Sequence, residues 1–544
     1  MRERPGPSTA SHGVALSLLF TSPAPSSHRQ RGRALVLSLQ GHTRQPTPPP
    51  CTSLQCPHFG VCSGCSLDDV ALIARPPLYE RARAFFQEAF GYALPPPQSP
   101  PQVHHWRAMA KLAVRPDDAS HPCIGLFRAG THEVIDIPDC VVHHPLISTT
   151  VECVRRAMHE TGISAYDERQ PLPFSLRYLQ ASVEQCTQRV QLTLVCHAKP
   201  PSADDALLPP AWQSFLANLI RSGEQAATSA DAPGVSLWHS IWIHFQSNPG
   251  NAIFDTRHLG GVHRTWRQVY GDVPFVRDEP LAPSAGTRYP GAVMLFPPYA
   301  FRQANPVAFR RVIDDMILWC LGDDTESPWH ALASVEGGIG VAEFCAGVGG
   351  LGQSVLLADA ARAERTGRRR VRALWCSDVQ GANAEAFWQA AAVNGLLSSD
   401  AADAPRIQYE EGSLEQLAAR IQSGSVPCDV LLADPPRAGL GASFVRTALL
   451  GGNDRGRPRR SVAAERTSCT PQRFIYISCG FDAFMRDTQQ FAAMRPSFTK
   501  TSAAGGGSAA PWRLRYARAY VLFPGSDHLE MLAVFDRKRP PRRQ

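Results

Sequence analysis

Three chemically reactive side chains stand at the edges of apolar runs towards the C-terminal end of the sequence. Cys479 follows the run FIYIS, Asp434 follows VLLA, and Glu530 precedes MLAVF. A thiol can act as a nucleophile, and a carboxylate can accept a proton or position a polar ligand. If the three runs are strands of one sheet, these groups meet at one edge and form a reactive site.

The size and composition of the chain limit what surrounds such a site. A chain of 544 residues exceeds what one core usually supports, so we expect about two or three domains. The net charge of +7 suits a polyanionic partner, but it would also suit many enzymes without one. The 15 cysteines are widely spread, which favours a reducing compartment over a disulfide framework. No apolar run approaches the roughly 20 residues that cross a bilayer, so no membrane span is expected.

Residues 1–50 differ in composition from the rest of the chain. They contain six Arg, seven Ser, no Lys, no Asp and one acid, Glu3. Organellar transit peptides are rich in Arg and Ser and poor in acid. We therefore expect an organellar protein, with the plastid preferred over the mitochondrion although composition does not separate them. A disordered tail or a secretory leader around Val14–Phe20 is the alternative, and a protein without a transit peptide would be cytoplasmic.

The remaining sequence divides into three parts. Residues 51–104 are rich in cysteine and include a helical segment from Pro77 to Phe90. Residues 105–300 contain apolar runs such as RVQLTLVCH and LWHSIWIHF, which predict a small β-rich domain. From 301 to 540 strand-like and helix-like segments alternate, which predicts a doubly wound parallel sheet. Within that part, 451–472 and 503–511 have the composition of surface insertions.

Three strand ends in the last part predict a cofactor site. VAEF is followed by a glycine turn that contains Gly347 and Gly349, which lets the backbone approach a ligand closely. Asp378 ends the next strand, where doubly wound folds bind ribose hydroxyls. Asp434 ends the third. The chain lacks a GxxxxGK[ST] loop, so the cofactor need not carry phosphates. S-adenosylmethionine meets that condition.

Six motifs in order resemble those of the RNA uracil-5 methyltransferase family, over residues of about 56–536. They are CPHFGVCSGC, FPPYAFRQANPVAF, VAEFCAGVGG, LLADPPRAGL, YISCGF and HLEMLAVF. The resemblance implies a Rossmann-like catalytic domain that forms 5-methyluridine in ribosomal or transfer RNA. It also implies a central β-rich domain of the OB type for RNA. The N-terminal RNA-binding module of the TRAM type that many relatives carry is expected to be absent, and we expect a monomer.

The resemblance assigns roles to the candidate residues. C5 of uracil is a poor nucleophile, so a thiolate must first add to C6, and Cys479 is expected to do so. Glu530 is expected to remove the C5 proton, and Asp434 to position the uracil. The residues expected to contact the cofactor are Gln303, Cys345, Gly347, Gly349, Asp378 and Asp434. Arg437 either supports the loop or meets a phosphate.

The sequence departs from the family pattern near the cofactor. Cys345 occupies the position of an aromatic residue, and Glu343 stands where Asp is usual. Gly480 replaces the common Asn after the nucleophile. These differences concern cofactor packing and leave the reaction class unchanged.

Four cysteines predict a metal site. Cys56, Cys62 and Cys65 are closely spaced, and Cys140 follows in VIDIPDC. A triplet with one remote partner favours an iron–sulfur cluster over zinc, which usually binds two close pairs. The family's 4Fe–4S cluster has the same arrangement. Metal-free thiols are the remaining alternative, and Cys51 is a possible substitute ligand. The expected role is to fasten the N-terminal segment to the β domain and shape the RNA surface.

Three other functions compete with uridine methylation. RNA cytosine-5 methyltransferases generally use a second cysteine in the turn that reads ADPPRAG here, and this turn has none. Methylation of an adenine amino group usually needs an Asn and an aromatic residue in that turn, and both are missing here. An RNA-binding protein that has lost catalysis is the alternative outside enzymes, and the presence of both Cys479 and Glu530 argues against it.

Overall fold

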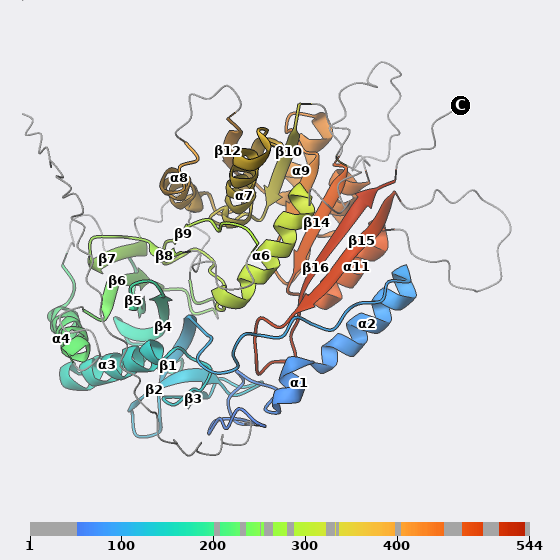
Figure 1. Ribbon diagram of the computed structural model, residues 1–544. Helices are drawn as coiled ribbons and strands as arrows, with labels where there is room; N and C mark the ends of the chain where they lie inside the picture. The colour runs from blue at the N-terminus through green and yellow to red at the C-terminus, as the bar shows by residue number, and fades with distance from the viewer. Residues whose placement is uncertain are drawn as a thin grey trace, which may run out of the picture. The chain divides into compact units, whose positions relative to one another are not determined.

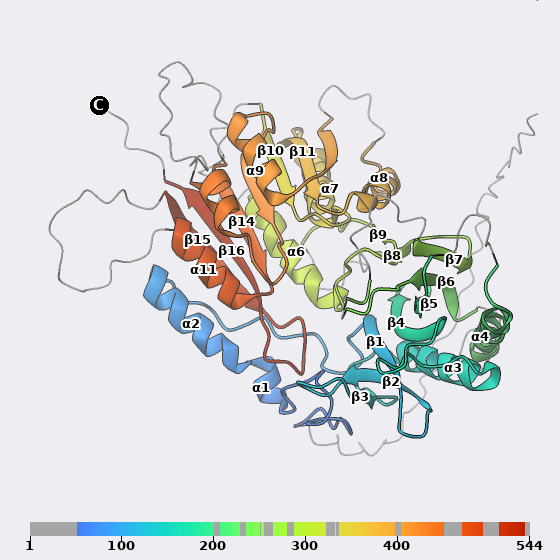
Figure 2. The same ribbon diagram turned by 180° about the vertical axis from the view of Figure 1, so that it is seen from behind.

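The computed structural model describes residues 52–200, 207–228, 236–250, 252–254, 265–279, 288–322, 332, 337–397, 404–450, 471–492 and 511–538. Cys51–Gln544 form one compact unit, shown from two sides in Figures 1 and 2. The predicted transit segment, Cys51 and most of the two expected insertions lie outside the described residues. No helix within these ranges is long and apolar enough to cross a membrane.

A seven-stranded sheet forms the central part of the chain, in the order β3-β2-β1-β4-β5-β6-β7. The strands are β1 (Met109–Pro116), β2 (Pro122–Phe127), β3 (Val134–Asp136), β4 (Ser175–Glu184), β5 (Arg189–His197), β6 (Trp238–Phe245) and β7 (Trp266–Tyr270). Helices α3 (Pro145–Thr161) and α4 (Pro210–Thr228) contribute apolar side chains to one core with β4 and β5. β5 and β6 run parallel because α4 connects them as a crossover.

The expected OB-type barrel is not confirmed. Such a barrel curls a sheet of about five strands into a partly open barrel, whereas β3 and β7 stand at opposite ends of this seven-stranded order in the part of the chain that is described. The sequence interpretation also missed α3. Its buried residues Ile147, Val151, Val154 and Met158 recur at helical spacing, which is the pattern that could have identified it.

A second seven-stranded sheet follows, in the order β12-β11-β10-β13-β14-β16-β15. Its strands are β10 (Ile339–Phe344), β11 (Val371–Asp378), β12 (Arg406–Glu411), β13 (Val430–Ala433), β14 (Arg473–Ser478), β15 (Trp512–Tyr520) and β16 (Glu530–Arg537). β10 to β14 are mutually parallel, whereas β15 and β16 are antiparallel to their neighbours. This agrees with the predicted doubly wound sheet and adds an antiparallel edge. β8 (Val276–Asp278) and β9 (Met294–Phe296) pair separately.

Helices cover both faces of the second sheet (Figure 1). α6 (Pro306–Leu321), α7 (Gly350–Thr366) and α8 (Ala384–Val393) pack into one core, and α9 (Leu414–Ser423), α10 (Ala442–Phe444) and α11 (Phe481–Phe491) pack into the other. The fully buried β10, β13 and β14 are apolar throughout most of their length, as strands covered on both faces must be.

The N-terminal segment packs against the second sheet. Its helices are α1 (Val70–Ala74) and α2 (Pro77–Phe90). Phe86 of α2 contacts Phe484 of α11, with ring centroids 5.7 Å apart. The amides of Ser66 and Leu67 donate to the carbonyl of Gly525 at 2.8 and 2.9 Å, in the loop between β15 and β16.

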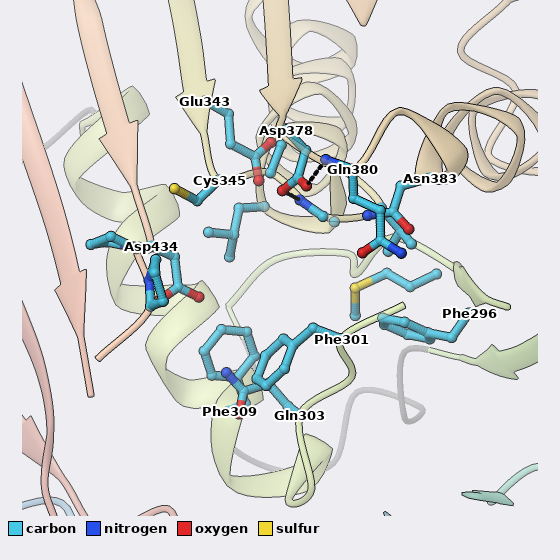
Figure 3. Close-up of a pocket in the computed structure, with 18 of the residues that line it drawn as sticks. Phe296, Phe301, Gln303, Phe309, Glu343, Cys345, Asp378, Gln380, Asn383 and Asp434 are labelled. Carbon is cyan, nitrogen blue, oxygen red and sulfur yellow. Dashed lines mark hydrogen bonds between the residues drawn. The ribbon is translucent and has the colours of Figure 1, made fainter. Parts of the chain in front are cut away.

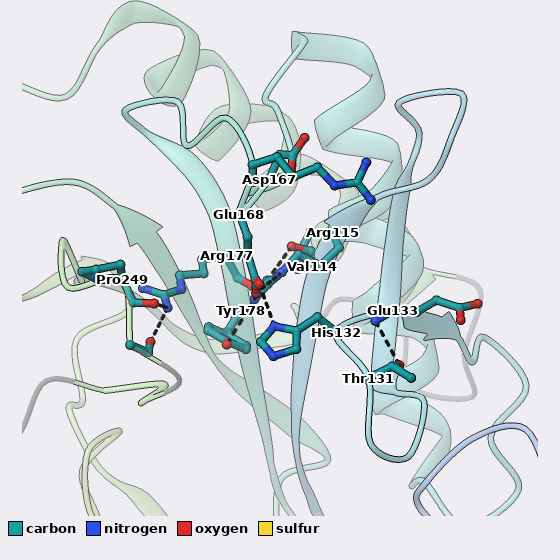
Figure 4. A network of polar contacts seen from close by, with 12 residues as sticks. Val114, Arg115, Thr131, His132, Glu133, Asp167, Glu168, Arg177, Tyr178 and Pro249 are labelled. Atoms are coloured by element: carbon teal, nitrogen blue, oxygen red, sulfur yellow. Dashed lines mark hydrogen bonds and ion pairs between the residues drawn. The ribbon is translucent and has the colours of Figure 1, made fainter.

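Charged groups on the central sheet hold neighbouring loops together (Figure 4). Arg115 is 6% exposed and donates to Glu168 Oε1 at 3.0 Å and to the carbonyl of Arg177 at 2.9 Å. Arg177 donates to the backbone carbonyls of 248–250. His132 Nδ1 lies 2.7 Å from Glu168 Oε2. The network fixes several loops around one end of β1 and β4.

Candidate active site

The ends of the strands bring the predicted residues to one edge of the second sheet. Cys345 follows β10, Asp378 ends β11, Asp434 follows β13 and Cys479 follows β14. Glu530 opens β16, which runs antiparallel to β14 and therefore begins at the same edge. The strand order reverses here, with β11 on one side of β10 and β13 on the other. Doubly wound sheets bind their ligands at this point.

A cavity of about 900 Å³ lies at this edge, near the upper end of the range of roughly 300–1,000 Å³ for ligand pockets. Apart from Gly349, the predicted catalytic and cofactor residues all line it: Gln303, Cys345, Gly347, Asp378, Asp434, Cys479 and Glu530. In Figure 3, Asp434 and Cys345 lie towards one end of the labelled group, with Gln380 and Asn383 at the other and Asp378 between them.

The glycine turn is fixed by contacts on both sides. Gly347 has a φ of 53°, its amide donates to Asp378 Oδ2 at 2.8 Å, and its carbonyl accepts from the Tyr409 hydroxyl at 2.7 Å. Gly349 has a φ of 74° and stands just before α7, where an added Cβ would collide with the ring of Phe387. Packing and backbone conformation therefore explain why residue 349 is a glycine. That Gly349 contacts the cofactor remains a prediction.

Buried acids surround the end of the cavity that contains the thiol. Burial raises the pKa of Asp434 to about 7. Burial and repulsion from Asp434 raise the pKa of Glu530 well above its usual range. Burial and the charges of Glu530 and Asp434 raise the pKa of Cys479 to about 11, whereas Arg437 lowers it. The Cys479 thiol and the Glu530 carboxyl therefore tend to hold protons near neutral pH, and each must be ionised before it can act as a nucleophile or a base.

A buried ion pair supports the loop that contains Gln303. Arg302 and Asp278 are 2% and 7% exposed. Arg302 Nε donates to Asp278 Oδ2 at 3.0 Å, and Arg302 Nη2 donates to the carbonyl of Val183 at 2.8 Å. Val183 belongs to β4 and Asp278 to β8. The central sheet thus holds the loop that enters the cavity wall.

Sequence reasoning missed part of the cavity wall. Gln380 and Asn383 line the cavity and follow Asp378 within a few residues, so their place after a strand-end acid could have identified them. Phe296 and Phe301 also line it. Both belong to the motif FPPYAFRQANPVAF, in which Gln303 was the only residue predicted to contact the cofactor.

The four predicted metal ligands line a second cavity of about 170 Å³: Cys56, Cys62, Cys65 and Cys140. None of them forms a disulfide. Burial and repulsion from the other three thiols raise the pKa of Cys65 to about 12, whereas Arg107 lowers it. In the described ranges no three His, Cys, Asp or Glu side chains are spaced as metal ligands. All four cysteines nevertheless line this one cavity, so the fold gathers them around one space.

The sequence is similar to those of RNA methyltransferases. No protein-family model matches the chain. An uncharacterized RNA methyltransferase of Protochlamydia amoebophila is 29% identical over 492 residues, which cover 89% of this chain and 98% of the relative. The 23S rRNA (uracil(1939)-C(5))-methyltransferase RlmD of Acidithiobacillus ferrooxidans is 22% identical over 519 residues, covering 94% of this chain and 88% of the relative. The relatives that match over most of this chain are therefore named as RNA methyltransferases.

A solved structure shows the same fold. The crystal structure of Pyrococcus abyssi tRNA (uracil-54, C5)-methyltransferase in complex with S-adenosyl-L-homocysteine superposes with a TM-score of 0.54 and 17% identity. The superposition covers 87% of this chain and 84% of that one. The predicted resemblance is therefore confirmed, and the α/β fold is that of an S-adenosylmethionine-dependent methyltransferase.

Proposed function

We propose that the protein is an S-adenosylmethionine-dependent methyltransferase that forms 5-methyluridine in ribosomal or transfer RNA. The observation that carries the proposal is the arrangement of Cys479, Asp434 and Glu530 in the wall of one cavity, which also contains the glycine turn and Asp378. The names of the relatives support uracil C5 as the target. A uridine paired in a duplex is inaccessible, so the target lies in a loop or is flipped out.

The cavity supplies each protein group that the reaction needs. The Cys479 thiolate adds to uracil C6, and the electron pair of the C5–C6 double bond makes C5 nucleophilic. The bound cofactor supplies the methyl group from its sulfonium. Glu530 then accepts the C5 proton, the double bond re-forms, and the Cys479 sulfur leaves C6 as a thiolate. Asp434 positions the uracil through a hydrogen bond.

The cavity also fits the proposed cofactor. Asp378 stands at the strand end where ribose hydroxyls are bound. Polar atoms of Gln380, Asn383 and Glu530 are buried in the wall and have no hydrogen-bond partner among the described residues. Such groups destabilise the fold unless a ligand or water pairs with them. Gln303 and Cys345 complete the proposed contacts.

The test is to incubate anaerobically purified protein with methyl-labelled S-adenosylmethionine and a panel of unmodified ribosomal and transfer RNAs, followed by nucleoside analysis. Labelled 5-methyluridine is expected, and a Cys186→Ala variant should still produce it. Cys186 is a matched control because it lines the same cavity but has no role in the chemistry. RNA binding without any label would instead indicate a protein that has lost catalysis.

We also propose that Cys56, Cys62, Cys65 and Cys140 hold a 4Fe–4S cluster. The gathering of the four thiols around one cavity supports this proposal. Arg107 also supports it, because its positive charge lowers the pKa of Cys65 and so favours the thiolate form that binds metal. Iron and acid-labile sulfide are expected in the anaerobically purified protein, with loss of both in a Cys65→Ser variant and not in a Cys123→Ser variant. Zinc in their place would contradict the proposal.

The cellular location and oligomeric state are proposed from the sequence. The composition of residues 1–50 supports import into an organelle, preferably the plastid, where the protein would act as a monomer on organellar RNA. Expression of residues 1–50 fused to a fluorescent protein tests the location. Sedimentation of the purified protein tests the monomer.

A further inference from the structure

Two amide side chains in the cavity wall have no identified role in the fold. We propose that Gln380 and Asn383 bind the ribose hydroxyls of the cofactor's adenosine, next to Asp378. This inference rests on the proposed use of S-adenosylmethionine and deepens it, because it assigns two further residues to recognition of the nucleoside.

Asn383 occupies a helix-capping position without capping the helix. It immediately precedes α8, where an Asn side chain commonly accepts a hydrogen bond from the first turn, but it makes no such bond. The residue is 2% exposed and lines the cavity. Its Oδ1 is buried and has no hydrogen-bond partner among the described residues. A buried amide oxygen without a partner costs folding free energy, which a bound hydroxyl would recover.

Gln380 presents the complementary group. Its Nε2 is buried and also has no partner within the described ranges, and the residue lines the same cavity. Its backbone amide donates to Asp378 Oδ1 at 2.8 Å, which ties it to the ribose-binding acid. Figure 3 shows the side chains of Gln380 and Asn383 to the right of Asp378, with a dashed line for the hydrogen bond between Gln380 and Asp378. The three residues therefore form one polar section of the wall.

The backbone between the two amides is held in place. The amide of Asn383 donates to the carbonyl of Gln380 at 3.0 Å, and the Tyr299 hydroxyl donates to the carbonyl of Ala382 at 3.4 Å. A Cβ on Gly381 would collide with the carboxylate of Glu411. The turn is thus packed on two sides, and the amide groups are positioned before a ligand arrives.

A vicinal diol matches the groups in this section of the wall. Each hydroxyl donates one hydrogen bond and accepts up to two, whereas an ionised carboxylate only accepts. Asp378 already accepts from the amides of Gly347 and Gln380. It can still accept from the diol, but it cannot donate to the hydroxyl oxygens. The Gln380 Nε2 supplies that donor, and the Asn383 Oδ1 supplies a further acceptor.

The base is expected to occupy other parts of the cavity. Val379 and Leu414 also line it, and their apolar side chains suit the flat faces of adenine. Contact of the two amides with the edge of the base is therefore the competing arrangement, and the ligands used in the test distinguish the two.

The test is calorimetric titration of the intact protein with S-adenosylhomocysteine and with its 2′-deoxy and 3′-deoxy analogues. Gln380→Leu and Asn383→Leu are each expected to weaken binding of S-adenosylhomocysteine by about 5–20-fold, because each removes one hydrogen bond to the ligand. The wild type should bind the deoxy analogue that lacks the contacted hydroxyl more weakly than S-adenosylhomocysteine, by a similar factor. The variant that lacks the amide contacting that hydroxyl should show a much smaller difference between the two ligands. Gln389→Leu is the control, since its exposed amide lies on α8 outside the cavity wall and bonds to Glu385.

The outcomes separate this inference from the proposed function. The inference is overturned if the variants bind S-adenosylhomocysteine as tightly as the wild type does. It is also overturned if their affinities for S-adenosylhomocysteine and for its deoxy analogues fall by the same factor. Neither result contradicts the proposed function. A wild-type protein that does not bind S-adenosylhomocysteine contradicts the proposed function itself. If a leucine variant unfolds, Gln380→Glu and Asn383→Asp replace it. Gln380→Glu removes the donor, so its affinity should no longer differ between S-adenosylhomocysteine and the deoxy analogue that lacks the contacted hydroxyl. Asn383→Asp keeps the acceptor, so its affinity should still differ between the two ligands.

Discussion

The two seven-stranded sheets use their buried polar side chains differently. On the central sheet, the side-chain nitrogens of Gln180 and Gln191 donate to backbone carbonyls of neighbouring loops, at 2.8 and 3.0 Å. Gln180 Oε1 is buried without a partner in the described part of the chain, but it does not line the cavity. At the edge of the second sheet, atoms of Gln380, Asn383 and Glu530 are buried in the cavity wall without a partner in the described part of the chain. Polar groups of the first kind maintain a shape, whereas those of the second kind are available to a ligand.

The largest effect is expected where the second sheet supplies a reacting atom. Cys479→Ala should reduce methyl transfer by at least about 10⁴-fold, because no other group can form the covalent bond to C6. Binding of RNA and S-adenosylhomocysteine should persist. Glu530→Gln should also stop turnover, but with protein–RNA adduct accumulating, since the C5 proton can no longer leave. Denaturing gel electrophoresis of labelled RNA measures the adduct. Methylation by Cys479→Ala would overturn the proposed mechanism.

The next largest effect is expected at Arg302, which joins the loop containing Gln303 to β4 and β8. Arg302→Met leaves the buried Asp278 carboxylate without its partner and should destabilise the protein by about 3–5 kcal/mol. The double variant Arg302→Met with Asp278→Leu removes both charges and should recover most of that stability. Because neither variant restores the support of Gln303, both should bind S-adenosylhomocysteine more weakly. Urea unfolding and calorimetry measure the two effects. Unchanged ligand affinity in the stable double variant would show that the ion pair serves folding alone.

The second sheet was more predictable than the central sheet, for physical reasons. Its functional residues stand at strand ends, and parallel strands place those ends at one edge whatever the loops between them do. Cys479 and Asp434 could therefore be placed together from local patterns. Glu530 followed because the family motif HLEMLAVF carried its position, although the antiparallel direction of β16 was not predicted.

The central sheet and the elements that join it to the cavity depend on contacts that local patterns do not encode. The pairing of Arg302 with Asp278 joins a loop to β8, and the sequence between them gives no sign of it. The parallel pair of β5 and β6 and the helix α3 were likewise missed, so a small barrel was expected in place of a helix-covered sheet. Gln380 and Asn383 differ: their place after Asp378 could have marked them as cavity residues, but only the structure shows that Gln380 Nε2 and Asn383 Oδ1 are buried without a partner among the described residues.

The pH dependence of the reaction tests whether the acids that line the cavity keep the Cys479 thiol protonated near neutral pH. The pKa of Cys479 is raised to about 11 by burial and by the charges of Glu530 and Asp434. The thiolate fraction therefore rises about tenfold per pH unit below that value, so kcat/KM should rise at least about 100-fold between pH 6 and pH 8. Methylation of short RNA at subsaturating concentration measures it. A plateau below pH 8 would mean that the thiol is already ionised in the free protein.

A buried acid of the second sheet should make stability depend on pH. Burial raises the pKa of Glu343 to about 7, although the Gly352 amide donates to its Oε2 at 2.8 Å. A carboxyl with a raised pKa binds its proton more tightly in the folded state, so its contribution to stability is lost as pH rises from the unfolded value through about 7. Glu343→Gln should therefore stabilise the protein at pH 8, by about 1–3 kcal/mol relative to its effect at pH 4. Thermal unfolding at both values measures the difference, and equal effects would contradict the assignment.

The smallest effect is expected for the exposed part of the central network. His132 contacts Glu168, but its side chain is 64% exposed, so His132→Ala should change the free energy of unfolding by about 0.5 kcal/mol or less. Arg115→Met provides the contrast, because it removes a 7% exposed guanidinium that bonds to Glu168 and to the carbonyl of Arg177. That change should cost about 2 kcal/mol or more, since it removes the donor to the buried carbonyl of Arg177 and a partner of Glu168. Neither variant should alter the affinity for S-adenosylhomocysteine, because neither residue lines the cavity. A large loss of affinity in His132→Ala would show that the network of the central sheet is coupled to the ligand site, and the division between shape-holding and ligand-binding polar groups would then fail.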